Sequence, residues 1–523
     1  MSRRVSSALA LATAPRRAAE RHPDVPIYLA RPLDLFPQAG DRLTYQSLAD
    51  LVDQTAAMLL GAGLAAGGRV LIVKEANFDI PLLALGCARA RLVPVLVHSA
   101  VGADDLAVLV ERCKPVALVT DARTETGGLL DAVPADVPRR LYVGAAGRFG
   151  AALTADDSVG LPTDRPADAD PQLVTHSSGT TGVPKLVLHS VRSFAGHARP
   201  QVTIGRVLRV HDPYLMCLSP VHARTMSGLL ALLALGLPMG FLTDPGLQDA
   251  ATMLERLRPG VVETVPNDYI RWEQLIEERP ELLSQIRLYV SSFDAAHPRT
   301  VQALLAAARP GARYMQAYGQ TETGPVTIKS HRLNRGCQDG RCVGRGLPGQ
   351  TKIKVADPSG TEVLPRGVPG AVFARSSGIT PSYLGSPDQR VEGWWSMGDY
   401  GVRSKRGCLH LYDRLVDRAT GVDSLLATED TILERMPQLT EAVLISVGDG
   451  TPPVPLVCTR GDAPLDLAAW SRAVVGLPEL AAPHLCRWED IPHTATWKVK
   501  RPEAGRRLLA GELVAPSGQP GGG

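Results

Sequence analysis

Arg69-Val-Leu-Ile-Val-Lys74 and the segment after it carry the pattern that decides the fold. The run between its arginine and lysine is wholly apolar and indicates a buried strand, residues 81–89 have helical spacing, and Leu92-Val-Pro-Val-Leu-Val97 indicates a second strand. Upstream, Thr44 opens a helical period that ends at the glycine-rich segment 61–68. Strands and helices that alternate in this way predict an α/β fold with mainly parallel sheets covered by helices.

The alternation continues along most of the chain and then changes. Further short strands are predicted at 117–120, 140–143, 215–218, 260–265 and 286–290. After about residue 371 the strands become shorter and richer in turns, and beyond 414 a helix–strand texture returns. We therefore predict a large N-terminal domain (1–413), a small α+β C-terminal domain (414–510) and a flexible tail (511–523).

Composition excludes several classes of protein. The chain has 523 residues, a formal net charge of +3 and 21% charged residues, which are typical of a soluble globular protein. So small a net charge provides no broad basic field, and this argues against nucleic acid as a partner. The longest apolar stretch, 228–241, contains glycine and proline and is shorter than the roughly 20 residues that cross a bilayer. We interpret it as a buried helix and expect no membrane span.

The cysteines indicate a reducing compartment. Of eight cysteines only Cys337 and Cys342 are close in sequence, and no second pair at zinc-ligand spacing accompanies them. We interpret the two as free thiols in a surface loop and expect a cytoplasmic protein. The N-terminus has basic residues before a run of small residues, as a signal peptide does, but Arg16 and Arg17 follow this run at once.

The segment 173–189 has the composition of a phosphate-binding loop. A predicted strand leads into His176-Ser-Ser-Gly-Thr-Thr-Gly-Val-Pro-Lys185, and a second strand follows. Glycines allow backbone N–H groups to turn inward, hydroxyls add donors, and Lys185 adds positive charge, which together suit polyphosphate oxygens. The glycine spacing and the following strand exclude a Walker A loop. Taken alone, the segment could equally be a plain hairpin.

Five motifs in order give the chain a plain resemblance to a known family. The loop resembles the phosphate-binding signature of the adenylate-forming superfamily, which includes acyl- and aryl-CoA synthetases, peptide-synthetase adenylation domains and luciferases. The other four similar segments are Arg42-Leu-Thr-Tyr-Gln-Ser-Leu with Gly67-Gly-Arg-Val, Tyr318-Gly-Gln-Thr-Glu-Thr-Gly, Ser396-Met-Gly-Asp-Tyr-Gly, and Pro492-His-Thr-Ala-Thr-Trp-Lys-Val-Lys-Arg. The resemblance implies a large domain that includes a small distorted β-barrel, and a small domain that rotates about a hinge.

The resemblance also implies a reaction and its cofactors. In the family, a carboxylate attacks the α-phosphate of ATP and expels pyrophosphate, with Mg²⁺ present. Because two anions must meet, the site has to supply positive charge and positioning. The phosphates are assigned to the loop residues Ser177, Ser178, Gly179, Thr180, Thr181, Gly182 and Lys185.

The remaining motifs supply the other roles. Thr321 is expected to donate to the α-phosphate, Glu322 to bind Mg²⁺, and Lys498 to bridge carboxylate and α-phosphate. The resemblance further places Tyr318 near adenine, Asp399 on the ribose hydroxyls, Arg414 over the same ribose and Gly319 in the substrate pocket. The alternatives are a helix-capping Thr-Glu pair and, for Lys498, a surface lysine beside Lys500.

Two departures from the family pattern concern the hinge and the thiol path. Val416 occupies the slot of the hinge residue, Asp417 follows as the acid, and Asp423 stands where relatives have a glycine that lets a pantetheine thiol pass. An aspartate in that wall would obstruct and repel a pantetheine-bearing group. We therefore expect adenylate formation to be intact and regard the thioester step as open.

Two further departures concern the acid pocket. Tyr289-Val-Ser-Ser-Phe-Asp-Ala-Ala-His-Pro places Phe293 and Asp294 where relatives have a Gly-Gly-Ala type of segment. Asp294 is predicted either to bind an amino or other donor group of the substrate or to cap a helix that begins at Pro298. His222, in Ser219-Pro-Val-His, is predicted to face the substrate, the alternative being a packed loop histidine.

The sequence thus predicts an ATP-dependent, AMP-forming acid ligase. A small-molecule carboxylic acid is the expected substrate, and CoA or a carrier-protein phosphopantetheine the usual acceptor in the family. An amine or another small nucleophile is the alternative acceptor, and a non-catalytic nucleotide-binding relative is the competing class. The sequence leaves open whether the protein is a monomer or a homodimer.

Overall fold

A computed structural model of the chain describes residues 7–134, 136–155, 159–177, 184–337, 339–384, 390–391, 393–419, 421–448, 450–493 and 499–513. Three of the predicted regions lie partly or wholly outside these ranges. They are Ser178 to Gly182 of the phosphate loop, Lys498, and most of the tail. No helix built from the described residues is long and apolar enough to cross a bilayer.

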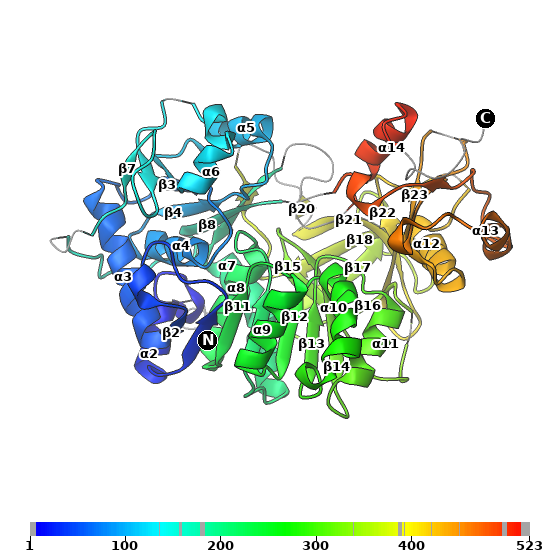
Figure 1. Cartoon of the computed structure of the whole chain (residues 1–523), viewed down its shortest axis with the longest axis horizontal. Coiled ribbons are helices and arrows are strands. Elements are labelled where there is room, and N and C mark those ends of the chain that lie inside the picture. The colour runs from blue at the N-terminus through cyan, green and yellow to red at the C-terminus, as the bar shows by residue number, and fades with distance from the viewer. Residues whose placement is uncertain are drawn as a thin grey trace.

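The first large sheet has a parallel half that forms the lower centre of Figure 1. Strands β14, β13, β12, β10, β11 and β1 run parallel in that order, and β2 pairs antiparallel with β1. Their bounds are β1 (Pro26–Leu29), β2 (Arg42–Thr44), β10 (Tyr214–Cys217), β11 (Met239–Leu242), β12 (Val261–Thr264), β13 (Leu288–Ser291) and β14 (Arg313–Gln320). The central strands β10, β11 and β12 are buried along their whole length because helices cover both faces of the sheet.

A second sheet is also mainly parallel. Its order is β19-β9-β8-β4-β3-β5-β6-β7, with antiparallel pairing only between β8 and β9 and between β9 and β19. The bounds are β3 (Arg69–Ile72), β4 (Val93–Leu96), β5 (Ala117–Thr120), β6 (Arg140–Tyr142), β7 (Ala151–Ala152), β8 (Pro171–His176), β9 (Leu186–Ser190) and β19 (Ser382–Tyr383). The predicted strand–helix–strand pattern at 69–97 is confirmed, and its two strands, β3 and β4, lie at the centre of this sheet.

Helices fill the space between the two sheets and cover their outer faces. The largest apolar core joins α3, α4, α7 and α8 to strands of both sheets, and a second core packs α9, α10 and α11 on the outer face of the first sheet (Figure 1). The bounds are α2 (Ala14–Arg21), α3 (Tyr45–Gly61), α4 (Asp79–Arg89), α5 (Ala103–Cys113), α6 (Ala122–Thr126), α7 (Val191–Val207), α8 (Ala223–Leu235), α9 (Leu247–Leu257), α10 (Pro266–Glu278) and α11 (Pro298–Ala307). The predicted α/β class with mainly parallel, helix-covered sheets is confirmed.

Beyond β14 the first sheet turns antiparallel and curls. Its order continues β15-β16-β22-β21-β18-β17, and β17 lies back against β15, which makes a distorted barrel. The bounds are β15 (Gly324–His331), β16 (Cys342–Gly346), β17 (Thr351–Ala356), β18 (Pro369–Ser376), β20 (Arg390–Val391), β21 (Trp394–Arg403) and β22 (Leu409–Arg414). Cys342 is buried on β16 and only Cys337 is exposed, so the prediction that both thiols lie in a surface loop is wrong for Cys342.

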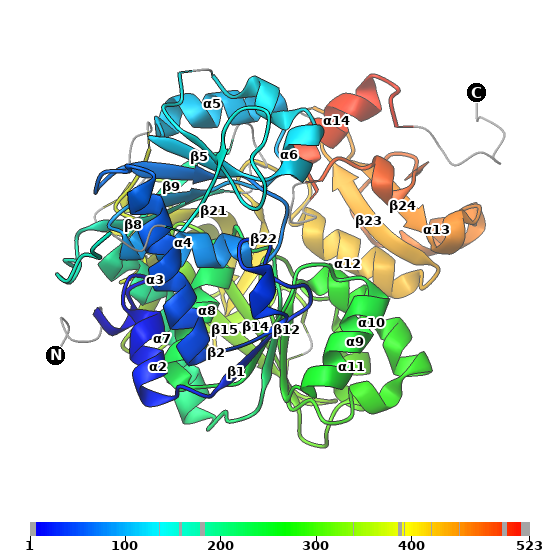
Figure 2. The same cartoon turned by 60° about the vertical axis from the view of Figure 1, so that its left-hand side comes forward.

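The described residues between 425 and 513 form a small layer of their own, visible at the right of Figure 2. A three-stranded sheet β23-β24-β25 packs against helices, with its own apolar cores. The bounds are α12 (Leu425–Arg435), β23 (Leu439–Ile445), β24 (Val454–Thr459), α13 (Leu467–Ala473), β25 (His484–Leu485) and α14 (Arg501–Leu509). The exact boundary at 414 stays a prediction.

The apolar stretch 228–241 is not one helix. Helix α8 ends at Leu235, Gly236 takes a left-handed conformation with φ of 68°, and strand β11 begins at Met239. Only glycine adopts such a backbone without strain, and Pro238 cannot continue a helix. The prediction of a single buried helix was therefore wrong in its second half.

One buried ion pair stands out in the core between α8 and the first sheet. Glu263 on β12 is fully buried and receives two hydrogen bonds from the Arg224 guanidinium, both 2.7 Å long. The Tyr214 hydroxyl donates to the same carboxylate at 2.5 Å, and Gln201 on α7 accepts from Arg224 at 2.7 Å. Because the two charges satisfy each other where little water reaches them, removing one would leave the other largely buried and uncompensated.

We expect Glu263→Gln to destabilise the protein by about 3–5 kcal/mol, because the Arg224 charge then lacks its counter-ion. Urea unfolding followed by circular dichroism measures this loss. Glu277→Gln, on the exposed face of α10, is the matched control and should change stability by no more than about 0.5 kcal/mol. Equal stability of the two variants would show that the buried ion pair does not contribute as described.

Candidate active site

A cavity of about 620 Å³ lies where β13 and β14 end, between the barrel, the β8–β9 hairpin and the small C-terminal layer. The structure brings eleven of the predicted site residues to its wall. These are Ser177, Lys185, His222, Phe293, Asp294, Tyr318, Gly319, Thr321, Glu322, Asp399 and Arg414. The predicted residues Ser178, Gly179, Thr180, Thr181, Gly182 and Lys498 lie outside the described residues.

The base of the phosphate loop is a closed hairpin. The Ser177 N–H donates to the Lys185 carbonyl at 2.9 Å, and the Lys185 N–H donates to Ser177 Oγ at 3.0 Å. The Lys185 ammonium lies 5.1 Å from the centre of the Tyr383 ring. A cation over an aromatic face is held by the negative potential of that face. The hairpin thus fixes one positive charge at the wall of the cavity.

Thr321 and Glu322 form the turn between β14 and β15. Gly319 permits this turn, since a side chain there would place its Cβ 2.1 Å from the Gly324 carbonyl oxygen. The Tyr383 hydroxyl donates to Glu322 Oε1 at 2.8 Å, so Tyr383 contacts both the carboxylate and the Lys185 cation. Glu322 is thereby held as an acceptor for a hard cation or a hydrogen-bond donor in the cavity.

Asp399 is held by two neighbours. Gly398, with φ of 68°, makes the turn that precedes it on β21, and Asp399 lies directly across from Arg414 on β22. Arg414 Nη1 is 3.2 Å from Asp399 Oδ1, and the Tyr318 hydroxyl donates to Asp399 Oδ2 at 2.5 Å. Burial and the Asp399 charge raise the pKa of Tyr318 well above its usual value, so the phenol keeps its proton.

Aromatic rings line the acid side of the cavity. His222 immediately precedes α8, and its ring centre is 5.1 Å from that of Phe293 and 6.3 Å from that of His176. Burial lowers the pKa of His176, which is therefore neutral near pH 7. Phe293 has φ of 81°, a left-handed backbone that a bulky side chain rarely adopts. Such strain is typical of functional sites.

Asp294 does not cap helix α11. The residue that precedes the helix is His297, which makes no side-chain capping bond, and Asp294 Oδ1 instead accepts the N–H of Ala295 at 2.8 Å. The capping alternative is therefore wrong. Asp294 is exposed and lines the cavity.

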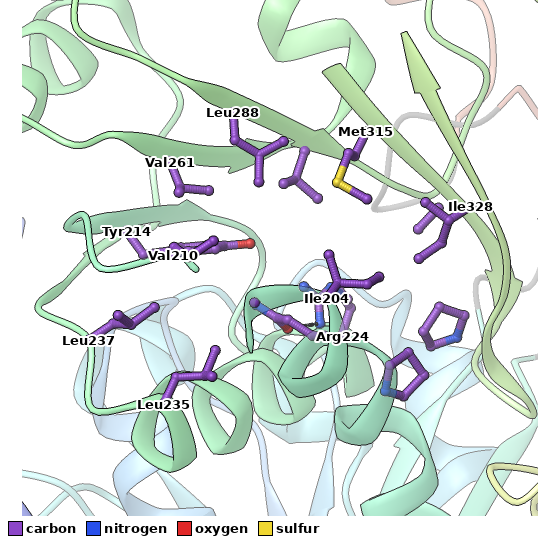
Figure 3. Close-up of a pocket in the computed structure, with 16 residues that line it drawn as sticks. Ile204, Val210, Tyr214, Arg224, Leu235, Leu237, Val261, Leu288, Met315 and Ile328 are labelled. Atoms are coloured by element: carbon purple, nitrogen blue, oxygen red, sulfur yellow. Dashed lines mark hydrogen bonds between the residues drawn. The ribbon is translucent and has the colours of Figure 1, made fainter. Parts of the chain in front are cut away.

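A second, smaller cavity of about 70 Å³ adjoins the first and was not foreseen from the sequence. Figure 3 shows its apolar wall, which includes Ile204, Val210, Leu235, Leu237, Val261 and Leu288. Arg224, Ala317 and Pro325 line both cavities, so the buried Arg224–Glu263 pair forms part of the partition. A possible signal was an arginine near the start of an apolar helix together with a glutamate inside the apolar strand Val261-Val-Glu-Thr.

Two further polar residues of the cavity wall were not predicted from the sequence. Gln316 Oε1 on β14 and Ser292 Oγ after β13 are buried and have no hydrogen-bond partner among the described residues. A buried polar atom without a partner costs about 1–3 kcal/mol, so such atoms are expected to meet a ligand. Gln316 precedes Tyr318 by two residues, which was the only sequence signal.

The C-terminal layer contacts the rest of the site through ion pairs. Arg501 makes two hydrogen bonds to Glu429, at 2.6 and 3.0 Å, and its Nε lies 3.9 Å from Asp417. Arg341, just before β16, pairs with Asp430 on α12 at 2.5 Å. Val499 and Arg501, the first and third residues after position 498, line the cavity.

The structure also places the residues that the sequence predicts for the hinge and the thiol path. Val416 is 71% exposed at the cavity wall, and Asp417 lines the cavity. Asp423 is exposed and does not line the cavity in this arrangement of the chain.

Comparison with known proteins identifies the family. The model of the AMP-binding enzyme family matches residues 15–384. A 3-amino-2-hydroxy-4-methoxybenzoate diazotase of Streptomyces cremeus is 38% identical over 532 residues, which cover 96% of both chains. A 4-chlorobenzoate–CoA ligase of an Arthrobacter species is 24% identical over 430 residues, which cover 79% of this chain and 80% of the relative.

Solved structures have the same fold. ATP-bound MatB of Rhodopseudomonas palustris superposes with a TM-score of 0.78 at 24% identity, over 95% of this chain and 99% of that one. The amide bond synthetase McbA of Marinactinospora thermotolerans gives 0.77 at 23% identity, with the same coverage. Together with the family match along most of its length, these findings place the chain in the AMP-binding family of adenylate-forming enzymes, and confirm the predicted class of an ATP-dependent, AMP-forming acid ligase.

Proposed function

We propose that ATP occupies the large cavity with its triphosphate at the β8–β9 hairpin. Ser177, Lys185 and the loop residues between them bind the phosphates, and Thr321 donates to the α-phosphate. Asp399, held by Arg414 and Tyr318, accepts the ribose hydroxyls. The unpartnered Gln316 Oε1 suits the exocyclic amino group of adenine, near Tyr318.

Glu322 is the proposed ligand of Mg²⁺. Its donor set fits a hard cation, since one carboxylate oxygen is fixed by Tyr383 and the group faces the cavity. Mg²⁺ in such sites is bound by one or two carboxylates together with phosphate oxygens and water, so phosphate oxygens would complete its coordination here. The ion would neutralise charge on the phosphates.

The first step is attack of an oxyanion on the α-phosphorus, with pyrophosphate as the leaving group. Lys498 is proposed to bridge the two anions. Val499 and Arg501, which follow it closely in sequence, line the same cavity. Positive charge aimed at developing negative charge lowers such a barrier by about 3–4 kcal/mol. The small domain is proposed to rotate at Arg414 to Val416 after this step, which withdraws the lysine.

We expect Lys498→Ala to lower the rate of ATP–pyrophosphate exchange by about 10²–10³-fold while ATP binding, measured by calorimetry, changes little. The loss is expected in the rate because the lysine contacts charge that develops in the transition state. Lys500→Ala, two residues along, is the matched control and should exchange at the parental rate. Full exchange activity in Lys498→Ala would show that Lys498 does not bridge the two anions.

We further propose that the acceptor of the activated group is an aromatic amine and that the overall reaction is a diazotisation. The observation that carries this proposal is the 38% identity, along 96% of both chains, with a protein named as a diazotase of an aminobenzoate. By comparison, a 4-chlorobenzoate–CoA ligase and a 4-coumarate–CoA ligase are 24% and 27% identical over shorter stretches. An amine acceptor agrees with the sequence resemblance, in which Asp423 stands where relatives have the glycine that lets a thiol pass.

The chemistry balances with one ATP per amine. A nitrite oxygen attacks the α-phosphorus and pyrophosphate leaves, which gives a mixed anhydride of nitrous acid and AMP. The amine nitrogen then attacks the nitrosyl nitrogen, the N–O bond to AMP breaks, and loss of water from the N-nitroso product gives the aryl diazonium ion. Nitrite has a bent O–N–O⁻ group like that of a carboxylate, so a site for acid adenylation suits it.

The acid side of the cavity supports an aromatic occupant. Phe293 and His222 present ring faces, and aromatic pairs gain about 0.5–1.5 kcal/mol beyond the area they bury. Ser292 Oγ is an unpartnered acceptor or donor at the same wall and suits a ring amino or hydroxyl group. The Arg224 charge is balanced by Glu263, so this wall is polar but nearly neutral.

The function is tested with purified enzyme, Mg²⁺, ATP, nitrite and a panel of aminobenzoates. We expect AMP, pyrophosphate and a diazonium product that forms an azo dye with an electron-rich naphthylamine, all dependent on nitrite and on the enzyme. Amide formation without nitrite would overturn diazotisation but keep the amine acceptor. A third outcome is ATP–pyrophosphate exchange that depends on a carboxylic acid, with a thioester formed on addition of CoA or a carrier-protein pantetheine and no amine product. This would overturn both the diazotisation and the amine acceptor.

We expect Phe293→Gly to raise the KM for the aromatic substrate about tenfold and to leave nitrite-dependent ATP–pyrophosphate exchange intact. The change should destabilise the protein less than the usual 3–5 kcal/mol of a phenylalanine truncation, because glycine relieves the left-handed backbone. Lys114, which follows α5, also has a left-handed backbone. Lys114→Gly is therefore the control for the release of backbone strain, and it should leave the KM unchanged. An unchanged KM in Phe293→Gly would exclude ring contact.

The proposed setting is the cytoplasm. All eight cysteines are unpaired, as expected in a reducing compartment. The enzyme would act on small molecules, and a monomer or homodimer would serve equally.

A further inference from the structure

A compact group of ionisable side chains lies in the barrel, outside the cavity. Lys329 on β15, Cys342 on β16 and His410 on β22 occupy neighbouring strands, and Cys342 is directly paired with His410 across the sheet. The Lys329 ammonium donates to Cys342 Sγ at 3.2 Å. His410 Nδ1 lies 2.6 Å from an oxygen of Asp339. We call these four residues the thiolate cluster.

The thiolate cluster is not part of the catalytic site. Arg341 and Val343, on either side of Cys342 in sequence, line the large cavity, and none of the four cluster residues does. Successive side chains of a strand point to opposite faces. Cys342 therefore faces away from the nucleotide and the substrate, and the proposed reaction leaves its chemistry unused.

The surroundings favour the ionised sulfur. Burial alone would favour the thiol, but His410, the Gly344 backbone N–H and Lys329 together hold the pKa of Cys342 below its ordinary value. Hydrogen bonds with Asp339 and then Cys342 raise the pKa of His410, so the imidazole is charged near pH 7. Two cations thus face one sulfur.

The other titratable neighbours do not cancel this effect. Burial and the Lys329 charge lower the pKa of His331, on the same strand as Lys329, to about 4, so it is uncharged near pH 7. Cys337 is exposed in the preceding loop and also interacts with Lys329. At Cys87 and Cys113, by contrast, burial is the larger influence and raises the pKa of the thiol, although the Arg69 charge partly opposes it at Cys113.

We propose that Cys342 is an oxidation site at which hydrogen peroxide converts the sulfur to sulfenic acid. The sulfur attacks one peroxide oxygen, an S–O bond forms, the O–O bond breaks, and hydroxide leaves and takes a proton from water or from the His410 imidazolium. Thiolates, not thiols, carry out this attack, so the paired cations select Cys342 among the buried cysteines. Access is through local opening of the exposed loop 332–337 that precedes β16.

Oxidation at this position would alter charge next to a domain contact. Conversion to neutral sulfenic acid removes the anion between Lys329 and His410, which then repel each other. Arg341, the residue before Cys342, pairs with Asp430 of α12 and so joins the barrel to the small C-terminal layer. The oxidation site therefore adjoins a contact that any rotation of the small domain must break.

The test uses the full-length enzyme with Cys337→Ser, which removes the exposed thiol of the same loop. The protein is treated with dilute hydrogen peroxide and a cyclic diketone that traps sulfenic acids, and peptides are quantified by mass spectrometry. We expect Cys342 to be labelled on the order of tenfold faster at pH 7 than Cys87, Cys113 and Cys217. The pH at which its labelling rate is half-maximal should lie below that of an ordinary thiol.

Two variants distinguish a thiolate that is stabilised by neighbouring cations from a thiol that reacts faster only because peroxide reaches it more easily. Lys329→Met and His410→Gln should each slow labelling of Cys342 near pH 7, and the rate should recover at alkaline pH, where any thiol ionises. Better access alone would not produce this recovery. Labelling of Cys342 no faster than of the other buried cysteines in the parent, or an ordinary pH profile in the parent, would overturn the proposal even if the variants fail to fold.

Discussion

The cross-strand pair between Asp399 and Arg414 is the interaction on which the arrangement of this enzyme depends. It joins β21, which carries Asp399, to β22, whose last residue is Arg414 and which precedes the small C-terminal layer. The Tyr318 hydroxyl adds a third element, the long strand β14, which arises from the parallel sheet. One carboxylate thus connects the parallel core through β14 with strands β21 and β22 of the barrel, so binding a ribose there would bear on all of them.

The parts of this molecule that could be predicted from sequence are those governed by local rules. Thr44 caps α3 through the N–H of Ser47, and short apolar runs such as 117–120 are strands because burial on both faces requires it. The stretch 228–241 was misjudged because apolar composition does not distinguish a buried helix from a buried strand, and the break depends on Gly236 and Pro238 alone.

The same distinction applies to the site. Motif residues such as Glu322 and Asp399 could be found because their neighbours in sequence define them. Arg224 and Glu263 could not, since they are 39 positions apart and meet only when α8 packs on β12. Ser292 and Gln316 were missed for a related reason, because an unpartnered buried atom is a property of packing and leaves no trace in the residue order.

The left-handed backbone at Phe293 has a consequence for anyone who improves this enzyme in the laboratory. The position holds a large ring in a conformation suited to glycine, so the native chain retains strain for the sake of what the ring contacts. Selection for heat resistance alone would favour its replacement. Screens for robust variants must therefore monitor turnover of the proposed aromatic substrate in every round, because hardier descendants are expected to lose the contact that this ring would make.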